Sequence, residues 1–197
     1  MPRTMKDRKV EILEAAGALL NEQGLGGLTI KNLAREVGFT EAAVYRHFES
    51  KEAILAGLLD TLHQSLVSHI KPILQDNQAT PLDKIQQILS RQLDYLIDHP
   101  EFIPATFSES ILNFSSSVNQ QMLTIIGKMQ NTLTQLVEAG QSAGHITRII
   151  PAEDIMSMLL GSFRFLLQRW QMNRRAFNLK TTGHQHINHL IQLIQNE

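Results

Sequence analysis

Polar and charged side chains suited to contact a polyanion gather between Thr40 and Lys51. Within about three helical turns the chain offers hydroxyl groups, an arginine, a histidine and a lysine. Such groups reach phosphates and the hydrogen-bonding edges of nucleic-acid bases. Because Ala43, Val44 and Phe48 are expected to face inward, the side chains left for a partner are Thr40, Glu41, Ala42, Tyr45, Arg46 and His47, followed by Lys51.

Glu41 is the acidic member of this set and allows two interpretations. Its carboxylate could accept a hydrogen bond from a cytosine amino group, or it could simply favour the positive N-terminus of a helix; we favour the second. Ser50 is expected to cap the next helix. The free N–H groups there, with Lys51 beside them, offer a place for a phosphate.

Two short helices joined by a tight turn must position these side chains. Thr29 predicts the start of the first helix, Gly38 its end and Thr40 the start of the second. Gly38 supplies a positive φ in the turn, and Ala34 is small where the second helix crosses the first. The pattern predicts a helix-turn-helix over about residues 30–49, packed on a longer preceding helix. These features alone leave a plain helical hairpin open as the alternative.

Apolar residues recur every three to four positions along almost the whole chain, which predicts an all-α fold of about nine helices. Strand-like alternation of β-branched and polar residues is missing, so no sheet is expected. Pro72 should kink or end the long helix that begins after Ser50. Besides this helix and the two short ones, helices are expected near residues 6–23, 81–98, 101–113, 116–140, 152–175 and 183–195.

The overall charge gives no electrostatic case for nucleic-acid binding, since 18 Lys and Arg face 19 Asp and Glu. Residues 1–48 are also nearly neutral, with seven basic and six acidic side chains. Non-specific affinity should therefore be limited, and tight binding should depend on dimerisation and a matched DNA site. The absence of cysteine excludes disulfides and thiolate metal sites. Neither a signal peptide nor a membrane span is expected, and the cytoplasm is the default location.

Residues 7–53 resemble the DNA-binding domain of the TetR family of bacterial transcriptional regulators. The resemblance is carried by the run GLGGLT from Gly24 to Thr29 and by YRHFESK from Tyr45 to Lys51. The rest of the chain agrees in helix count, in His99-Pro100-Glu101 at the start of a sixth helix, and in the GQSAGHI link before a C-terminal helix pair.

The resemblance implies a helix-turn-helix domain over residues 1–52 and a ligand-binding and dimerisation domain over residues 53–197. It implies a homodimer formed through the last two helices, bound to an inverted-repeat operator in double-stranded DNA. It also implies base or phosphate contacts by Thr40, Glu41, Ala42, Tyr45 and His47, and phosphate contacts by Thr29, Arg46 and Lys51.

Aromatic and methionine side chains on the later helices could line a cavity for a small apolar or amphipathic effector of unknown identity, although most of them must be ordinary core. The candidates are Phe102, Phe107, Phe114, Met122, Met158 and Phe163.

Three further patterns have plainer structural interpretations. Gly140 to Gly144 spells the G-x-S-x-G nucleophile elbow, but that motif needs a strand where a helix is expected. His184 lies off the helical face that His186 and His189 share, so surface or interface histidines are favoured over a metal site. The arginines at 164, 169, 174 and 175 spread over three turns and indicate a solvated face or pairing between subunits. No catalytic residue, cofactor or metal is expected.

The favoured function is a ligand-released repressor, with the long helix after Ser50 as the lever between the domains. The alternatives are a DNA-binding architectural or cell-division factor without ligand control and, with less support, a helical enzyme or small-molecule carrier. No acid/base pair, HExxH motif or phosphate loop supports an enzyme.

Overall fold

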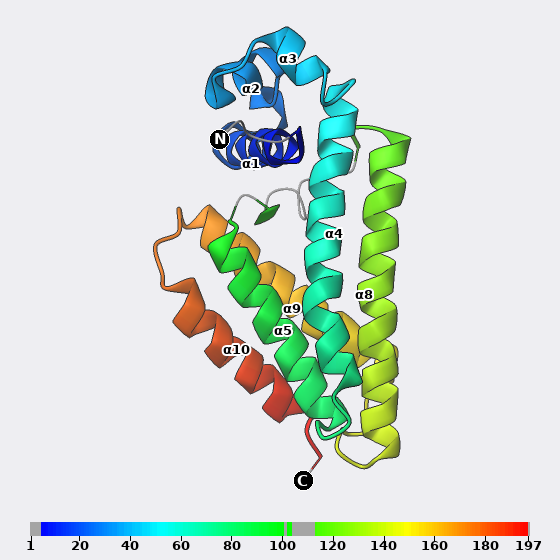
Figure 1. The fold of residues 1–197 in the computed structure, drawn as a ribbon. Helices are drawn as coiled ribbons and strands as arrows, with labels where there is room; N and C mark the ends of the chain where they lie inside the picture. The colour runs from blue at the N-terminus through cyan, green and yellow to red at the C-terminus, as the bar shows by residue number, and fades with distance from the viewer. Residues whose placement is uncertain (1–4, 101, 104–112, 197) are drawn as a thin grey trace. The chain divides into compact units, whose positions relative to one another are not determined.

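The computed structural model describes residues 5–100, 102–103 and 113–196 (Figure 1). The all-α prediction is confirmed: the described residues form eight labelled helices and no strand, apart from an isolated bridge between Ile146 and Gln195. Most of the helix expected over 101–113 lies outside the described residues.

Packing divides the chain into two compact units. The N-terminal unit comprises residues 1–64 and 99–124, and the C-terminal unit comprises residues 65–98 and 125–197. Two long helices, α4 (Lys51–Gln75) and α8 (Ser116–Ser142), contribute residues to both units. The N-terminal unit therefore takes in more of the chain than the helix-turn-helix itself.

The N-terminal unit contains α1 (Met5–Gly27), α2 (Ile30–Val37) and α3 (Glu41–Tyr45), followed by the first part of α4. Gly24 interrupts α1 with a φ of 65° and a ψ of −169°, where the sequence predicts a helix end. Apolar side chains of these helices form the core of the N-terminal unit, which includes Ile12, Ala16, Leu19, Leu33, Val44, Ile54 and Leu58.

The start of α8 runs beside the start of α4 (Figure 1), and hydrogen bonds join the two helices. Ser115 Oγ donates to Glu52 at 2.7 Å, and the Gln121 amide donates to the Ala56 carbonyl at 3.1 Å and to Asp60 at 2.6 Å. The first helical turns of α4 are thus fixed from two sides, by the helix-turn-helix and by α8.

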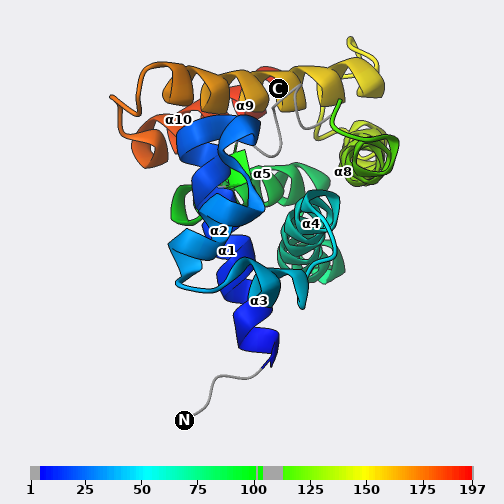
Figure 2. The same cartoon turned by 90° about the horizontal axis from the view of Figure 1, so that it is seen from above.

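The C-terminal unit contains the rest of α4 and α8 together with α5 (Pro81–Asp98), α9 (Ala152–Met172) and α10 (Leu179–Ile194). Figures 1 and 2 show α10 alongside α5 and α9, the two helices on which it packs. The interior faces are apolar and include Leu89, Leu93, Ile155, Leu159, Leu167, Ile187 and Ile191.

Two predicted helix boundaries in this unit are wrong. The helix expected to reach residue 175 ends at Met172, because Arg174 and Arg175 adopt left-handed backbone with φ of 51° and 62°. The helix expected to begin at Gly183 begins at Leu179, where the Asn178 side chain accepts from the Thr181 N–H.

Gly183 lies inside α10 because it packs against α5, and not because the chain turns there. A Cβ at this position would collide with the side chain of Leu93. Pro72 likewise does not end its helix, since α4 continues to Gln75.

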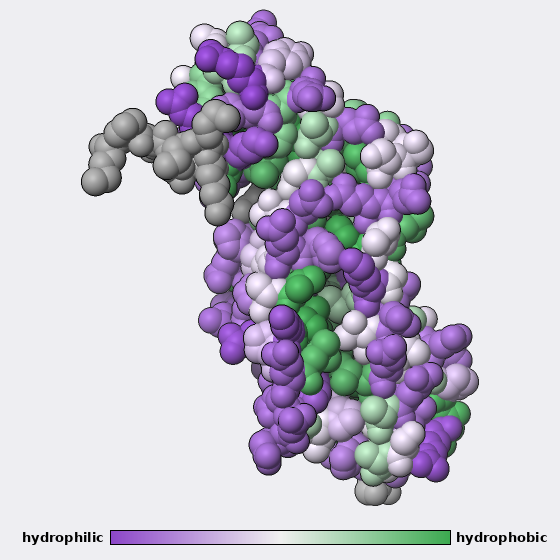
Figure 3. All heavy atoms as spheres, turned by 45° about the vertical axis from the view of Figure 1, so that its right-hand side comes forward, coloured by the Kyte–Doolittle hydropathy of each residue, from purple (hydrophilic) through white to green (hydrophobic). Residues whose placement is uncertain are grey.

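None of the helices in the described part of the chain is long and apolar enough to cross a membrane. The face drawn in Figure 3 is mostly hydrophilic, with apolar residues gathered in a few patches.

Candidate nucleic-acid interface

The start of α2 is fixed by the side chains of Thr29 and Asn32. Thr29 Oγ1 accepts from the Asn32 N–H at 3.1 Å, and the Asn32 amide donates back to the Gly27 carbonyl at 2.9 Å. Together these bonds set the direction in which the chain leaves α1 and enters α2. Thr29 caps the helix, as predicted. The return bond from the Asn32 side chain is not among the predictions, although the position of Asn32, three residues after a capping threonine, is a signal for such a bond.

Gly38 forms the turn between α2 and α3. Its φ of 70° and ψ of 30° are left-handed, and the next N–H, that of Phe39, bonds to the Ala34 carbonyl at 2.8 Å. Thr40 then caps α3 by accepting from the Ala43 N–H at 3.2 Å. Val44 is fully buried, so it anchors α3 to the helices beneath it. The predicted helix-turn-helix is therefore present, with both of its expected caps.

The outward face of α3 agrees with the prediction for most of its members. Tyr45 is 51% exposed, and four further side chains are exposed: Thr40, Glu41, Ala42 and Arg46. Glu41 lies in the first turn of α3, where its negative charge complements the helix dipole. A short helix with a free polar face is thus available to a groove of DNA.

His47 differs from this set because it is half-buried. Its Nδ1 atom is buried and has no hydrogen-bond partner within the described residues. One side of the imidazole ring therefore faces the protein.

Lys51 lies at the first position of α4 and is engaged within the protein. Its Nζ donates to the Leu25 carbonyl at 2.6 Å and lies 5.3 Å from the centre of the Phe114 ring. Burial lowers the pKa of the ammonium below its ordinary value. Lys51 thus ties the end of α1 to α4, a role that the sequence did not predict.

The start of α4 carries the predicted Ser50 cap, whose Oγ accepts from the Ala53 N–H at 3.1 Å. Glu52, in the first turn, places a carboxylate at the same helix end. An approaching phosphate would meet this negative charge as well as the free N–H groups.

Two basic residues of α1 pack against aromatic rings of the helix-turn-helix. The Arg8 guanidinium lies 5.6 Å from the centre of the Phe39 ring, and the Lys9 ammonium lies 5.6 Å from that of Phe48. Both basic side chains are exposed. They add positive charge beside the turn and beside the end of α3, which the neutral sum for residues 1–48 conceals.

The candidate effector residues do not share one environment. In the N-terminal unit Phe102 and Met122 are buried, while Phe114 is half-buried against Lys51. In the C-terminal unit Phe163 is buried, but Met158 is 46% exposed. Phe107 lies outside the described residues.

The G-x-S-x-G match and the histidines of α10, for which the sequence favours a structural interpretation, lie as follows. Ser142 is the last residue of α8, so a helix and not a strand precedes it. His184 pairs with Asp94 of α5 at 2.9 Å, away from His186. His186 bonds instead to Ser162 of α9 at 2.6 Å. Among the described residues no cluster of three His, Cys, Asp or Glu side chains could hold a metal ion.

Two short, capped helices with an exposed polar face, held on a longer helix, define a DNA-binding protein of the helix-turn-helix class. The model of bacterial regulatory proteins of the tetR family matches residues 12–58, and the tetracyclin repressor-like C-terminal domain matches residues 81–196. The chain therefore belongs to the TetR family of DNA-binding transcriptional regulators, which are not enzymes.

Individual relatives are distant in sequence. The chain is 25% identical over 137 residues to the nucleoid occlusion factor SlmA of Marinomonas sp. (strain MWYL1), covering 70% of this chain and 69% of that protein. Its fold matches the ketosteroid transcriptional regulator KstR2 of Mycobacterium tuberculosis with a TM-score of 0.85, at 18% identity and 98% coverage of both chains. It also matches FadR of Bacillus subtilis, solved with stearoyl-CoA, with a TM-score of 0.76, at 20% identity and 94% and 98% coverage.

Proposed function

We propose that the protein is a homodimeric repressor that binds an inverted-repeat operator and is released by a small effector. The observation that carries the DNA-binding part is the exposed face of α3, held on a capped helix-turn-helix. A recognition helix of this kind enters the major groove with its N-terminal residues against the bases.

We assign the DNA contacts by position on this surface. Thr40, Glu41, Ala42, Tyr45 and His47 contact bases or phosphates, while Thr29, Arg46 and Lys51 contact phosphates. Lys51 has to exchange or share the Leu25 carbonyl to do so, and Thr29 keeps its capping bond. Arg46, exposed at the end of α3, is the phosphate contact with the fewest competing bonds.

An apolar stripe on the last two helices supports the homodimer. Met158, Phe165 and Met172 are 46, 61 and 74% exposed and follow one another every seven residues on α9, so they share one face. Gly161 lies on the same face with open space around it, and Leu193 of α10 is 69% exposed. Large exposed apolar side chains in a row mark a protein–protein surface, and a two-fold dimer places the same surface on both subunits. We therefore move Met158 from the effector site to the dimer face.

The dimer requires a fixed spacing between its recognition helices. To read both half-sites, the two recognition helices must lie about 34–36 Å apart, which is one turn of DNA. We propose α4 as the lever, because it begins next to the helix-turn-helix and extends into the C-terminal unit. A small apolar or amphipathic effector then releases DNA only to the extent that it binds the unproductive spacing better than the productive one.

The proposal is tested by selecting duplexes from a random pool and measuring the stoichiometry of the complex by sedimentation. An inverted repeat bound by two protomers is expected. Inserting five base pairs between the half-sites should abolish tight binding, because it rotates one site by roughly half a turn of DNA. Selection of unpaired single sites, bound by one protomer, would contradict the dimeric operator.

The similarity to a nucleoid occlusion factor favours a second candidate, a DNA-binding cell-division factor without ligand control. Mapping of the bound sites on the chromosome separates the two. Sites confined to regions upstream of genes support the regulator, and sites spread through genes support the cell-division factor. Either function places the protein with the chromosome in the cytoplasm, and specific DNA binding would exclude a simple carrier.

A further inference from the structure

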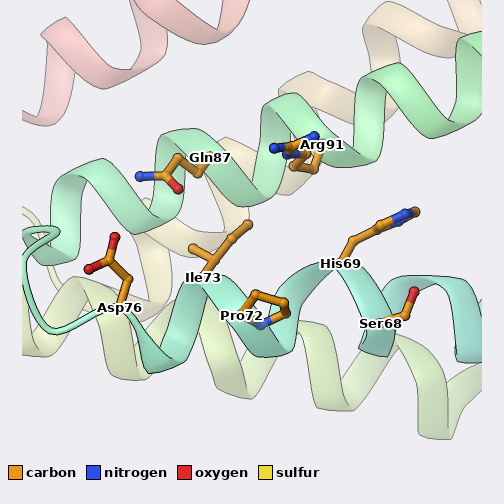
Figure 4. A pocket seen from close by; sticks show the side chains of 7 residues that line it. All are labelled: Ser68, His69, Pro72, Ile73, Asp76, Gln87 and Arg91. Atoms are coloured by element: carbon orange, nitrogen blue, oxygen red, sulfur yellow. The ribbon is translucent and has the colours of Figure 1, made fainter.

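A groove opens between the second half of α4 and α5, within the C-terminal unit (Figure 4). Its volume is about 350 Å³, which is within the range of small-molecule sites. Four residues of α4, the residue that follows it and two residues of α5 line it: Ser68, His69, Pro72 and Ile73, then Asp76, with Gln87 and Arg91. None of these belongs to the predicted effector residues.

One end of the groove is basic. Arg91 of α5 and His69 of α4 line it there, as Figure 4 shows, and Arg91 has no hydrogen-bond or ion-pair partner among the described residues. The His69 ring packs against the Tyr95 ring, with the ring centres 5.7 Å apart, and its Nδ1 lies 3.5 Å from Ser65 Oγ. A guanidinium with free donors suits a carboxylate, which it binds through two parallel hydrogen bonds.

The other end is acidic. Asp76 lies just beyond the last turn of α4, across from Gln87 of α5 (Figure 4). One carboxylate oxygen of Asp76 accepts from the Gln78 N–H at 2.8 Å, which leaves the second oxygen for a ligand. The neighbouring Lys84 donates to the Leu74 carbonyl at 3.2 Å. The negative end of the α4 dipole adds to the attraction for a cation here.

The middle of the groove is mainly apolar, with one backbone acceptor. Ile73 is buried to 7% exposure and forms the floor together with the Pro72 ring. Because proline has no N–H, the Ser68 carbonyl has no donor in the helical ladder. An alkyl chain fits this floor, and its two ends would meet opposite charges.

We propose that this groove binds a small zwitterion whose anionic group pairs with Arg91 and whose cationic group pairs with Asp76. Arg91 lies at the same end of the groove as His69 (Figure 4), and Asp76 follows His69 by seven residues, directly after the last residue of α4. The two charged ends of the groove, and hence the two charges of the ligand, are therefore about 10 Å apart. This proposal deepens the effector role proposed above. The release of DNA by the zwitterion rests on the proposed repressor function, whereas binding of the zwitterion to the groove does not.

Linear ω-amino acids test the proposal by isothermal titration with the full-length protein. ω-Aminooctanoate, whose charges are about 10 Å apart when extended, should bind with one site per protomer. γ-Aminobutyrate is too short to span the groove, while octanoate and octylamine each lack one charge. All three should bind at least tenfold more weakly, since each loses a charge-assisted hydrogen bond.

Substitutions identify the two ends. Arg91→Ala should weaken ω-aminooctanoate about tenfold, and Asp76→Asn should weaken ω-aminooctanoate while leaving octanoate unchanged. Asn at 76 can still accept from the Gln78 N–H, so the turn is kept. Lys71→Ala is the matched control, because Lys71 is exposed on the same helix without lining the groove.

Three results would overturn the proposal: no binding of ω-aminooctanoate, equal binding of octanoate, or an unchanged affinity in Arg91→Ala with its fold intact by circular dichroism. DNA binding by the ligand-free protein is measured separately on a selected duplex, so that a failure of the proposed repressor function shows there alone. Binding of the zwitterion without release of DNA would support the site and remove only its regulatory role.

Discussion

The ammonium of Lys51 and the carbonyl oxygen of Leu25 lie 2.6 Å apart, joining the first turn of α4 to the end of α1 across 26 positions of sequence. The family resemblance implies that Lys51 contacts a phosphate of DNA. The structure gives it a partner inside the protein, with the Phe114 ring 5.3 Å away. A substitution at this position is therefore expected to change the stability of the N-terminal unit as well as DNA binding.

Lys51→Met keeps the apolar stem and removes the ammonium. We expect the free energy of unfolding to fall by about 1–3 kcal/mol, because the Leu25 carbonyl loses a charged donor. Thermal unfolding of the mutant measures this. Lys31→Ala, an exposed lysine on α2, is the control and should leave the melting temperature unchanged. A mutant that loses DNA affinity at an unaltered melting temperature would show that Lys51 acts on DNA alone.

Arg46 and Tyr45 should differ in what they contribute to DNA binding. Arg46→Ala should weaken all duplexes by a similar factor and lower the salt dependence by about one phosphate contact. Tyr45→Ala should change which bases are preferred at one position of each half-site. Affinity measured over a panel of single-base variants at two salt concentrations separates these effects. If the Tyr45→Ala variant keeps the base preferences of the wild type, the Tyr45 side chain takes no part in base readout.

Phe165→Asp should dissociate the proposed dimer, because it places a charge in the middle of the α9 stripe. Sedimentation is expected to show monomers, with the loss of inverted-repeat binding as the consequence. Ile149→Asp provides a control of the same chemistry, since Ile149 is 91% exposed but lies in the turn before α9. If the Phe165→Asp variant remains a dimer, the dimer interface does not lie on the α9 stripe.

His186 makes stability depend on pH. Desolvation, with Arg169 and His189 nearby, lowers its pKa below the ordinary 6.5. The unfolded chain takes up the proton near that ordinary value and the folded chain only at lower pH. The unfolded state thus binds more protons in between, and stability falls as the pH drops through this window. Melting curves from pH 7 to 5 should show the loss, and His186→Gln should reduce it. If the stability of the variant falls with pH as steeply as that of the wild type, groups other than His186 cause the pH dependence.

Gly183→Ala should destabilise the C-terminal unit by about 1–3 kcal/mol, because the added methyl group collides with Leu93, which is fully buried. Gly127→Ala on α8 is the matched control. Nothing lies near its added methyl group, so alanine should stabilise that helix by up to about 1 kcal/mol. Denaturant unfolding measures both variants, and a Gly183→Ala variant as stable as the wild type would contradict the packing role of Gly183.

Local signals in the sequence predicted the helix-turn-helix well. The caps at Thr29 and Thr40 and the left-handed Gly38 depend on residues within four positions, and such short-range chemistry is legible in a sequence. The boundaries of α5, residues 81–98, follow from the same kind of signal.

Contacts between distant residues could not be predicted in this way. Nothing local in the sequence indicates the Leu25 carbonyl as a partner of the Lys51 ammonium, because the two residues are 26 positions apart. The sequence predicts a helix boundary at Gly183, and this is wrong because a glycine needed for close packing looks like a glycine in a turn. The exposure of Met158 is also not legible in the sequence, because an exposed apolar face and a buried one have the same periodicity.

Binding to DNA from the region upstream of its own coding sequence, measured at two salt concentrations, tests the central claim most directly. We expect a specific complex at low salt that weakens steeply at higher salt, since phosphate contacts release counterions. We also expect it to be lost in a variant that carries both Arg46→Ala and Tyr45→Ala. Tight and specific binding by that variant, with the same salt dependence as the wild type, would contradict the assignment of the interface to α3.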